Sequence, residues 1–413
     1  MAICIWRGDA APVTQETRVT AAAIEVGDQF ILTINGKSIT VIAASTSAST
    51  LIAALATAWN TSSLAEFSEV TATVDGTTLV LRGDKPGVPF VVTGSTINGG
   101  AADTQTLSIA ATTVASGPNF WTTPRNWSGN AVPVSGDEVY LVDSAVDILY
   151  GLNQAAVAPA SLNIEQSFTG RIGLRAVNGL GYAEYRDQYL RIAATKVHIG
   201  RGSGAGSSRI KLDTGTTATT VNIFDTGNAE DGTTSVVWCG NSTAAMLNVF
   251  RGSLGIALRP GETATLGTLR IAPEPVTGRE TRVELGPGVT ITTIDKCGGQ
   301  LRFAGQSVAN LIQHEGSTTI ESGDVTALRV RGGTVVYNST GTLSAATVSA
   351  AGKLDFSQDV RSKVVTAPIE IYGPAARVSD PFQVIPNLVL DLNETPLPGL
   401  DLGTNVRITR SAP

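Results

Sequence analysis

The acidic side chains of this sequence are the first candidates for chemistry, because two carboxylates held at a fixed separation can cleave a glycosidic bond. That separation is about 5 Å in retaining enzymes and about 6.5–9.5 Å in inverting ones. The acids in turn-like sequence that could pair across neighbouring strands are Asp225, Glu230, Asp231, Glu321 and Asp355. Aromatic residues, which stack on sugar rings, make up only 5% of the chain, and scattered surface acids are usually solvated. We therefore expect no catalytic residues and no enzymatic activity.

A second acidic pattern is the tripeptide Asp-Thr-Gly, which occurs at Asp213 and again at Asp225. Aspartic proteases carry this signature on two separate lobes, so that the two carboxylates share one proton. Here only twelve residues separate the two copies, and threonine and glycine occur between them. Both copies are therefore interpreted as turns.

Histidine, cysteine and glycine-rich sequence do not indicate a metal or cofactor site. The residues concerned are His198, His314, Cys4, Cys239, Cys297 and the stretch Gly200–Gly206. The cysteines lie far apart without a Cys-x-x-Cys pair, which predicts free thiols in a reducing cytoplasm. The glycine-rich stretch lacks the Lys-Ser/Thr of a P-loop, so it is interpreted as a surface loop. We expect no metal and no cofactor.

The overall charge argues against two classes of partner. The formal net charge is −6, whereas a nucleic-acid-binding surface requires clustered lysine and arginine. No apolar run approaches the 18 residues or so that span a bilayer, and the first residues do not resemble a secretion signal. We therefore expect neither nucleic acid nor membrane as a partner.

Composition predicts a mainly β protein. Charged residues make up only 15% of the chain, against about 25% in typical globular proteins. Small polar residues and 44 glycines take their place, as in a β-rich shell with many tight turns. The predicted divisions are an extended N-terminal arm, an α+β module, an aromatic junction and cap, a parallel β-helix or solenoid, and a proline-rich C-terminal cap, at residues 1–19, 20–115, 116–137, 138–380 and 381–413.

The α+β module is predicted from its hairpins. Gln29–Ile42 alternates in apolar character around an Asn-Gly pair, and Val70–Leu81 does so around an Asp-Gly pair. Such pairs are the strongest short-range hairpin signals. Further strands are expected over residues 89–93 and 104–114. One helix against a sheet is the expected unit.

The helix of the module should follow the first hairpin. Ser47 and Ser49 are candidate N-caps, and Leu51, Leu55 and Trp59 recur every four residues. This spacing predicts a short amphipathic helix with one apolar face.

A short repeat predicts the solenoid. The pattern glycine-x-apolar-x-apolar starts at Gly299, Gly316, Gly333 and Gly352, at intervals of 17, 17 and 19 residues, with earlier copies at Gly170 and Gly252. A unit this short fits one layer of stacked parallel strands and is too short for a helical repeat. The expected inward residues are Leu301, Phe303, Val335, Tyr337, Leu354 and Phe356. A β-sandwich is the alternative, but hairpin turns are scarce after residue 100.

Two segments carry resemblances. The segment from Val26-Gly-Asp-Gln-Phe30 to Val92, with its Asn-Gly-Lys hairpin and a helix ending in Ala-Trp-Asn60, resembles a domain of tailed-phage and prophage structural proteins. The segment Asn126-Trp-Ser-Gly-Asn-Ala-Val-Pro133 to Val139 is similar to the entry cap of bacterial surface β-solenoids, notably autotransporter-associated repeats. Neither motif is catalytic.

These resemblances imply a non-enzymatic structural component of a tailed-phage virion, assembled in the host cytoplasm. A capsid decoration or cement protein attached through its N-terminal module is the expected role, and a tail spike or fibre that binds or degrades surface polysaccharide is the alternative. We expect other virion proteins as partners and a homo-oligomer, with carbohydrate as a further candidate ligand. Ile3, Ile5 and Trp6 form an apolar segment that is the expected docking strand, by addition to an exposed sheet edge; a frayed terminus or a first core strand is the alternative.

Overall fold

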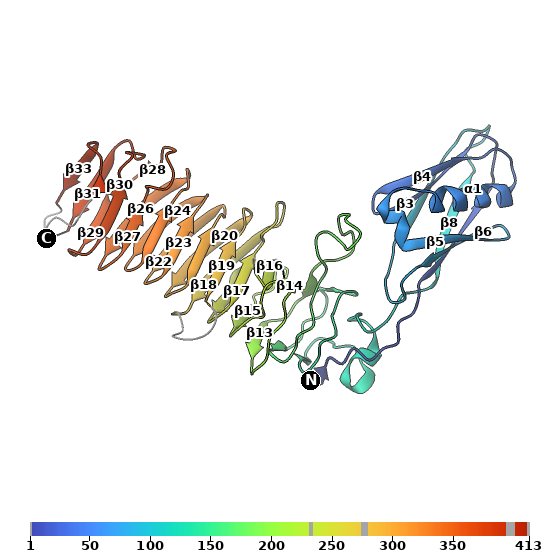
Figure 1. Cartoon of the computed structure of the whole chain (residues 1–413), viewed down its shortest axis with the longest axis horizontal. Coiled ribbons are helices and arrows are strands. Elements are labelled where there is room, and N and C mark those ends of the chain that lie inside the picture. The colour runs from blue at the N-terminus through green and yellow to red at the C-terminus, as the bar shows by residue number, and fades with distance from the viewer. Residues whose placement is uncertain (1, 231–233, 274–279, 394–400, 411–413) are drawn as a thin grey trace.

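The computed structural model describes residues 2–230, 234–273, 280–393 and 401–410 of the 413-residue chain. The fold is mainly β and has two parts, an α+β module and a long stack of parallel strands (Figure 1). Each part has a hydrophobic core of its own. The mainly β class and the parallel strand arrangement are thus as predicted.

The module consists of two antiparallel sheets and one α-helix. One sheet has the order β5-β6-β2-β8 and the other β4-β3-β7. The elements are β2 (Glu16–Ala22), β3 (Gln29–Ile34), β4 (Lys37–Ile42), α1 (Ala48–Asn60), the 3₁₀ helix η1 (Ala65–Glu69), β5 (Val70–Asp75), β6 (Thr78–Gly83), β7 (Val92–Ile97) and β8 (Thr106–Thr113).

Local sequence explains most of the module. Asn35 and Gly36 have φ values of 47° and 68°, as a tight hairpin turn with two left-handed residues requires. The Ser47 hydroxyl accepts a hydrogen bond from the Thr50 N–H and caps α1. The buried face of α1 includes Leu55 and Trp59, and the indole N–H of Trp59 donates to the Val70 carbonyl at 2.7 Å. Both predicted hairpins and the predicted helix are confirmed.

The expected N-terminal arm is wrong as a single extended segment. Residues 16–19 belong to β2, which pairs with β6 and β8 in the module. Residues 3–5 form β1 (Ile3–Ile5), which pairs in parallel with β9 (Glu138–Leu141) at the first layer of the stack. The module is therefore inserted between the first two strands of the stack.

Two long parallel sheets make up the stack. Sheet 1 contains β1, β9, β11 (Ser161–Glu165), β13 (Lys196–Arg201), β15 (Thr220–Ile223), the second half of β16 (Val236–Val249), β18 (Ala264–Ile271), β20 (Val289–Lys296), β22 (Ser307–Gln313), β24 (Asp324–Val330), β26 (Thr342–Ser349), β28 (Val364–Val365), β29 (Ile369–Tyr372), β31 (Leu388–Leu392) and β33 (Val406–Thr409). Sheet 2 contains β10 (Asn153–Gln154), β12 (Leu190–Ile192), β14 (Ile210–Asp213), the first half of β16, β17 (Ser253–Ile256), β19 (Arg282–Leu285), β21 (Gln300–Phe303), β23 (Ser317–Ile320), β25 (Thr334–Tyr337), β27 (Lys353–Asp355), β30 (Arg377–Asp380) and β32 (Asp401–Leu402).

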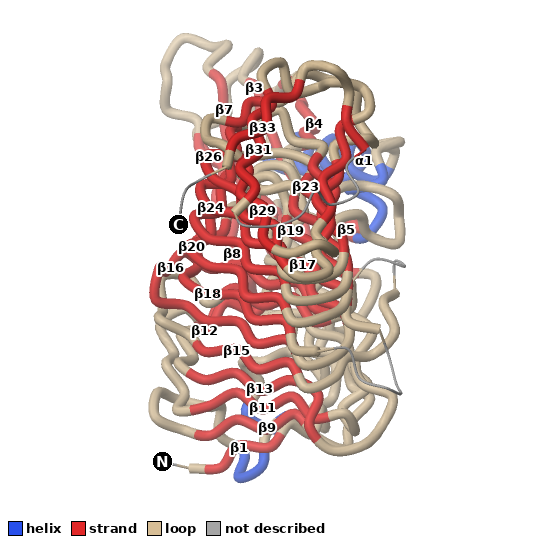
Figure 2. Tube along the Cα trace, turned by 90° about the vertical axis from the view of Figure 1, so that its left-hand side faces the viewer, coloured by secondary structure: helices blue, strands red, loops and turns tan. Residues whose placement is uncertain are grey.

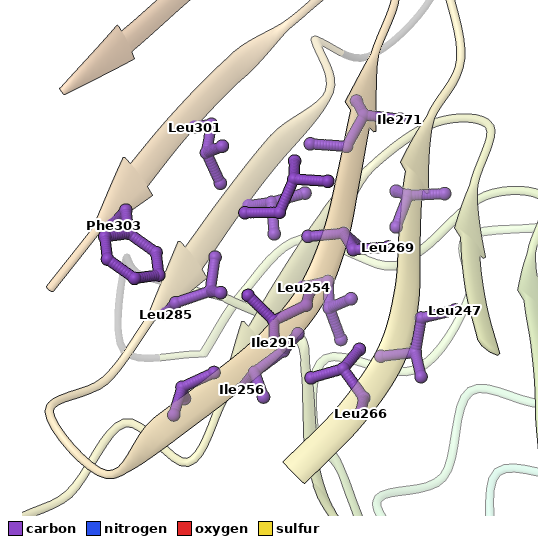
Figure 3. Packing of buried hydrophobic residues seen from close by; sticks show 14 of the residues in the cluster. Leu247, Leu254, Ile256, Leu266, Leu269, Ile271, Leu285, Ile291, Leu301 and Phe303 are labelled. Atoms are coloured by element: carbon purple, nitrogen blue, oxygen red, sulfur yellow. The ribbon is translucent and has the colours of Figure 1, made fainter. Parts of the chain in front are cut away.

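Successive layers superpose equivalent residues. Leu301 of β21 pairs with Thr318 of β23, which pairs with Val335 of β25 and then with Leu354 of β27. All six residues predicted to point inward are buried. Figure 2 shows the strands of neighbouring layers running side by side, and Figure 3 shows leucine, isoleucine and phenylalanine side chains packed between the sheets. The repeat identified in the sequence is thus the layer of the stack.

The repeat glycines lie at the turns that precede sheet 2 strands. Gly299, Gly316 and Gly333 have positive φ, and a Cβ on Gly333 would lie 2.0 Å from the carbonyl oxygen of Gly316 in the previous layer. Only glycine fits such a left-handed, closely stacked corner.

The predicted C-terminal cap is only partly described, and its described part differs from the prediction. β31 and β33 continue sheet 1 in register, and β32 continues sheet 2. Pro381 and Pro386 lie in the connection before β31, where the missing N–H breaks no ladder. Pro396 and Pro398 lie outside the described residues. The parallel strands therefore extend beyond residue 380.

Candidate functional site

The predicted docking strand is β1, the first strand of sheet 1, which pairs with β9 of the same chain. Cys4 pairs with Val139 in register, and Trp6 is 1% exposed in the core of the stack. The outer edge of β1 is covered by Ser128, whose hydroxyl accepts from the Ile5 N–H at 2.8 Å. Only Ile3 keeps most of its surface in solvent, at 63% exposed. The residues chosen for docking therefore build the first layer, and Trp6 is not available to a partner.

Three tryptophans close this end of the stack. Trp127 makes edge-to-face contacts with Trp6 and Trp121, at centroid distances of 5.1 and 4.7 Å. The Trp127 indole N–H donates to the Trp121 carbonyl at 2.7 Å. Beside them, Asp137 accepts from the Ala2 N–H at 2.8 Å, and backbone hydrogen bonds hold the pKa of Asp137 below its usual value. The aromatic junction covers the edge that β1 would otherwise leave open.

A long loop, residues 173–189, lies between β11 and β12 of the stack and contacts the module; Figure 1 shows it on the side of the stack that faces the module. The Arg186 side chain, 9% exposed, lies between the two parts. It forms a two-pronged ion pair with Glu184, with bonds of 2.7 and 3.0 Å, and lies 3.6 Å from Glu69 of the module. The guanidinium also lies 4.9 Å from the ring centre of Tyr185. Nearby, the Asn35 amide donates to the Ala183 carbonyl at 3.0 Å. The loop therefore fixes the module against the stack.

The same loop contributes Tyr189 to the lining of a groove on the outer face of sheet 2. The groove has a volume of about 650 Å³. Its floor includes Val237 and Glu284 on the strands, and Leu258 and Pro260 form the facing wall. At one end the Tyr189 hydroxyl donates to Glu262 at 2.6 Å. Two inserted loops thus shape a hollow on an otherwise regular surface.

The groove lining is cationic although the chain is acidic. Arg209, Lys211, Arg259 and Arg302 line it, against Glu230 and Glu284. Burial acts to raise the pKa of Glu230, but the guanidinium groups of Arg175, Arg209 and Arg171 outweigh it, so the pKa lies below the usual glutamate value. Glu230 is therefore held in its ionised form. The lining still contains four cationic side chains against two carboxylates, which makes the groove suited to a negatively charged ligand.

The acids considered for glycosidic cleavage do not come together as an isolated pair. Each described member is ion-paired with a cation: Asp225 with Arg251, Glu230 with three arginines, Glu321 with Arg302 and Asp355 with Lys353. Asp231 lies outside the described residues. The two Asp-Thr-Gly copies lie on different sheets, with Asp213 at the end of β14 and Asp225 after β15.

The module carries an apolar row on its surface. Ile42 of β4 and Ile97 of β7 both pair with Gln29 of β3, so the three residues lie side by side across the sheet. Ile42 is 62% and Ile97 49% exposed, and Val26, three residues before Gln29 in the sequence, is 60% exposed. Val26, Ile42 and Ile97, with Gln29 between the two isoleucines, are called the apolar row of the module below.

The loop 173–189 was missed as a functional element in the sequence. Its signal is the clustering of Tyr182, Tyr185 and Tyr189 in a chain with seven tyrosines. Burial raises the pKa of Tyr185 to about 12, as expected for a ring packed at an internal interface. A second missed group is Asp295, Cys297 and His314, side chains of metal-binding type that meet on the outer face of sheet 1.

Comparisons with known proteins do not assign the chain to a family. No family model matches the sequence, and no curated protein matches it significantly. No described helix has the length and apolar character that crossing a bilayer requires.

Proposed function

We propose that this chain is a non-enzymatic structural component of a tailed-phage virion, most specifically a capsid decoration or cement protein attached through its N-terminal module. We also propose that the stack is a closed β-solenoid, which would present a rigid surface. Other virion proteins and further copies of the chain would be its partners, in virions assembled in the host cytoplasm.

The observation that carries this proposal is the continuous core. Buried apolar residues run through the stack from Cys4 to Leu392 as one cluster. A stack in which every layer packs on the next resists bending, because the strands of each layer are hydrogen-bonded to those of its neighbours. Such a body suits a role in spacing or bridging other proteins.

The attachment surface would be the apolar row of the module. An exposed apolar row on a sheet face can bury against a partner, and each fully buried isoleucine contributes about 1.5–3 kcal/mol. The loop 173–189 would hold the stack in a fixed orientation relative to the attached module, because Arg186 of this loop contacts the module.

The test uses particles released from cells that carry the gene. The wild type, the double variant Ile42→Asp with Ile97→Asp, and the control Val360→Asp would be compared by cryo-EM and mass spectrometry of purified particles. Val360 is 76% exposed and lies on the stack, so the control introduces one charge of the same sign elsewhere. We expect the double variant alone to be lost from particles while circular dichroism shows it folded. If the double variant stays on the particles, the apolar row is not the attachment surface. If the wild type itself is absent from the particles, the proposed virion role is wrong.

The groove favours a second candidate, a tail spike or fibre that binds an acidic polysaccharide. Arg259 and Arg302 lie in its lining, and guanidinium groups pair well with carboxylates. Affinity electrophoresis with polygalacturonate as the probe tests it. Retardation that is weakened in Arg259→Ala and Arg302→Ala, but not in Arg329→Ala on sheet 1, would support this candidate. Equal mobility of all four proteins with and without the probe would eliminate it.

A further inference from the structure

Asp295, Cys297 and His314 form a compact group on the outer face of sheet 1. Asp295 lies in β20 and Cys297 directly follows that strand, so both side chains point outward on alternate positions. His314 follows β22 in the next layer. Because Lys296 pairs with Gln313 in register, Cys297 and His314 are neighbours in adjacent layers.

The ligand atoms of this group converge. A carboxylate oxygen, the thiol sulfur and an imidazole nitrogen all lie within 4.8 Å of one another, and all three residues are half-buried. The His314 Nε2 lies 3.2 Å from an Asp295 carboxylate oxygen. Small side-chain rotations would bring three such atoms to the 2.0–2.3 Å distances of zinc ligands.

The residue types select one class of ion. Thiolate and imidazole favour zinc and related transition metals, whereas calcium and magnesium prefer oxygen ligands throughout. Three protein ligands leave a fourth tetrahedral position for water or a further group.

The charges around the group also fit. Arg270 pairs in register with Asp295, and Arg331 follows His314 in the next layer. A cation held by neutral ligands would be repelled by these arginines. A divalent ion bound by one thiolate and one carboxylate forms a neutral unit, so this ligand set tolerates its neighbours.

A cysteine–histidine–aspartate group could instead serve nucleophilic chemistry, which requires an activated thiolate. Burial, and then the nearby carboxylates of Asp295 and Glu315, raise the pKa of the Cys297 thiol. The protonated thiol is a poor nucleophile, but a metal ion can displace its proton.

We propose that Asp295, Cys297 and His314 bind one zinc-class divalent metal ion, which links two neighbouring layers of the stack. The site would act as a staple on the outside of sheet 1, because its ligands come from two successive strands of the ladder. The proposal is independent of the virion role and of the groove.

The test is titration of the purified full chain with Co²⁺ and with Zn²⁺. Co²⁺ bound to a thiolate produces a charge-transfer absorption in the near ultraviolet. We expect this band to saturate at one equivalent in the wild type and in the control Cys239→Ser, and to be absent in Cys297→Ser. Zn²⁺ affinity measured against a chromophoric chelator should fall at least tenfold in His314→Gln and Asp295→Asn, and should be unchanged in His198→Gln.

Thermal unfolding provides a second measurement. Saturating Zn²⁺ should raise the melting temperature of the wild type and of Cys239→Ser but not that of Cys297→Ser, since only a ligand bound to the folded state stabilises it. Absence of the cobalt band at stoichiometric metal, or equal Zn²⁺ affinity in the wild type and the three site variants, would overturn the proposal.

Discussion

Arg186 donates a hydrogen bond from its Nη1 to the carbonyl oxygen of Pro89 at 3.2 Å. The two residues belong to different parts of the molecule, since Pro89 lies in the module and Arg186 in a loop of the stack. The same guanidinium pairs with Glu184, whose side chain is 3% exposed. One side chain therefore serves both the internal structure of the loop and its contact with the module.

Arg186→Ala should destabilise this junction. Removing one partner of a buried ion pair leaves the other charge unpaired, at a cost of about 3–5 kcal/mol. We expect faster proteolysis within loop 173–189 and a wider distribution of module positions in small-angle X-ray scattering. Arg331→Ala, at an exposed position directly after β24, is the control. Unchanged scattering and proteolysis in Arg186→Ala would show that other contacts hold the module.

Trp127→Ala should weaken the first layer of the stack. Trp127 is fully buried between Trp6 and Trp121, and loss of such a ring costs about 3–5 kcal/mol. Urea unfolding followed by tryptophan fluorescence should show an earlier transition, with hydrogen exchange increased first in β1 and β9. Val360→Ala, on an exposed surface, should leave both measurements unchanged. A protection pattern equal to the wild type in β1 would contradict the capping role of this cluster.

Glu230→Gln should make the free energy of unfolding less dependent on pH in the acidic range. The pKa of Glu230 is lower in the folded state than its ordinary value of 4.5, so its stabilising effect is complete above that value and disappears as the pH falls through the folded pKa. At pH 7 the variant should be less stable than the wild type by about 2 kcal/mol. The difference should close below the folded pKa. Urea midpoints measured across this range test the sign, and a gap that widens in acid would refute it.

Gly204→Ala should cost more than Gly202→Ala. Both glycines have positive φ, but a Cβ at Gly204 would lie 2.2 Å from the Gln166 carbonyl oxygen, whereas the nearest atom at Gly202 is 3.6 Å away. A left-handed alanine costs about 1–2 kcal/mol, and the clash adds about 1–3 kcal/mol. The two melting temperatures, compared with that of the wild type, separate these effects. Equal shifts would mean that the loop moves away from Gln166 without cost.

Local signals explain which parts of the fold were predictable. The hairpin turns at Asn35 and Asp75 depend on residues next to one another, and the layers after residue 299 repeat at an almost constant interval. The position of β1 could not be predicted from local signals, because Cys4 pairs with Val139, which is far along the chain. An apolar first strand has the same sequence pattern whether it pairs with a partner protein or with a strand of its own stack.

The candidate sites were less predictable than the fold. The groove depends on the folded positions of two inserted loops, and the repeat pattern of the sequence does not predict these positions. The group of Asp295, Cys297 and His314 did have a signal, since Cys297 and His314 are 17 residues apart, as are Gly299 and Gly316. Zinc fingers place paired ligands only a few residues apart, whereas in stacked layers the relevant spacing is the length of the repeat.

The insertion of the module between β1 and β9 also imposes an order on biosynthesis. β1 has no partner until residues 138–141 have left the ribosome, which at typical translation rates is on the order of ten seconds after β1 itself emerges. During that interval the local hairpins and helix of the module can already form. The nascent chain must therefore keep this apolar segment from wrong associations until its strand neighbour is made.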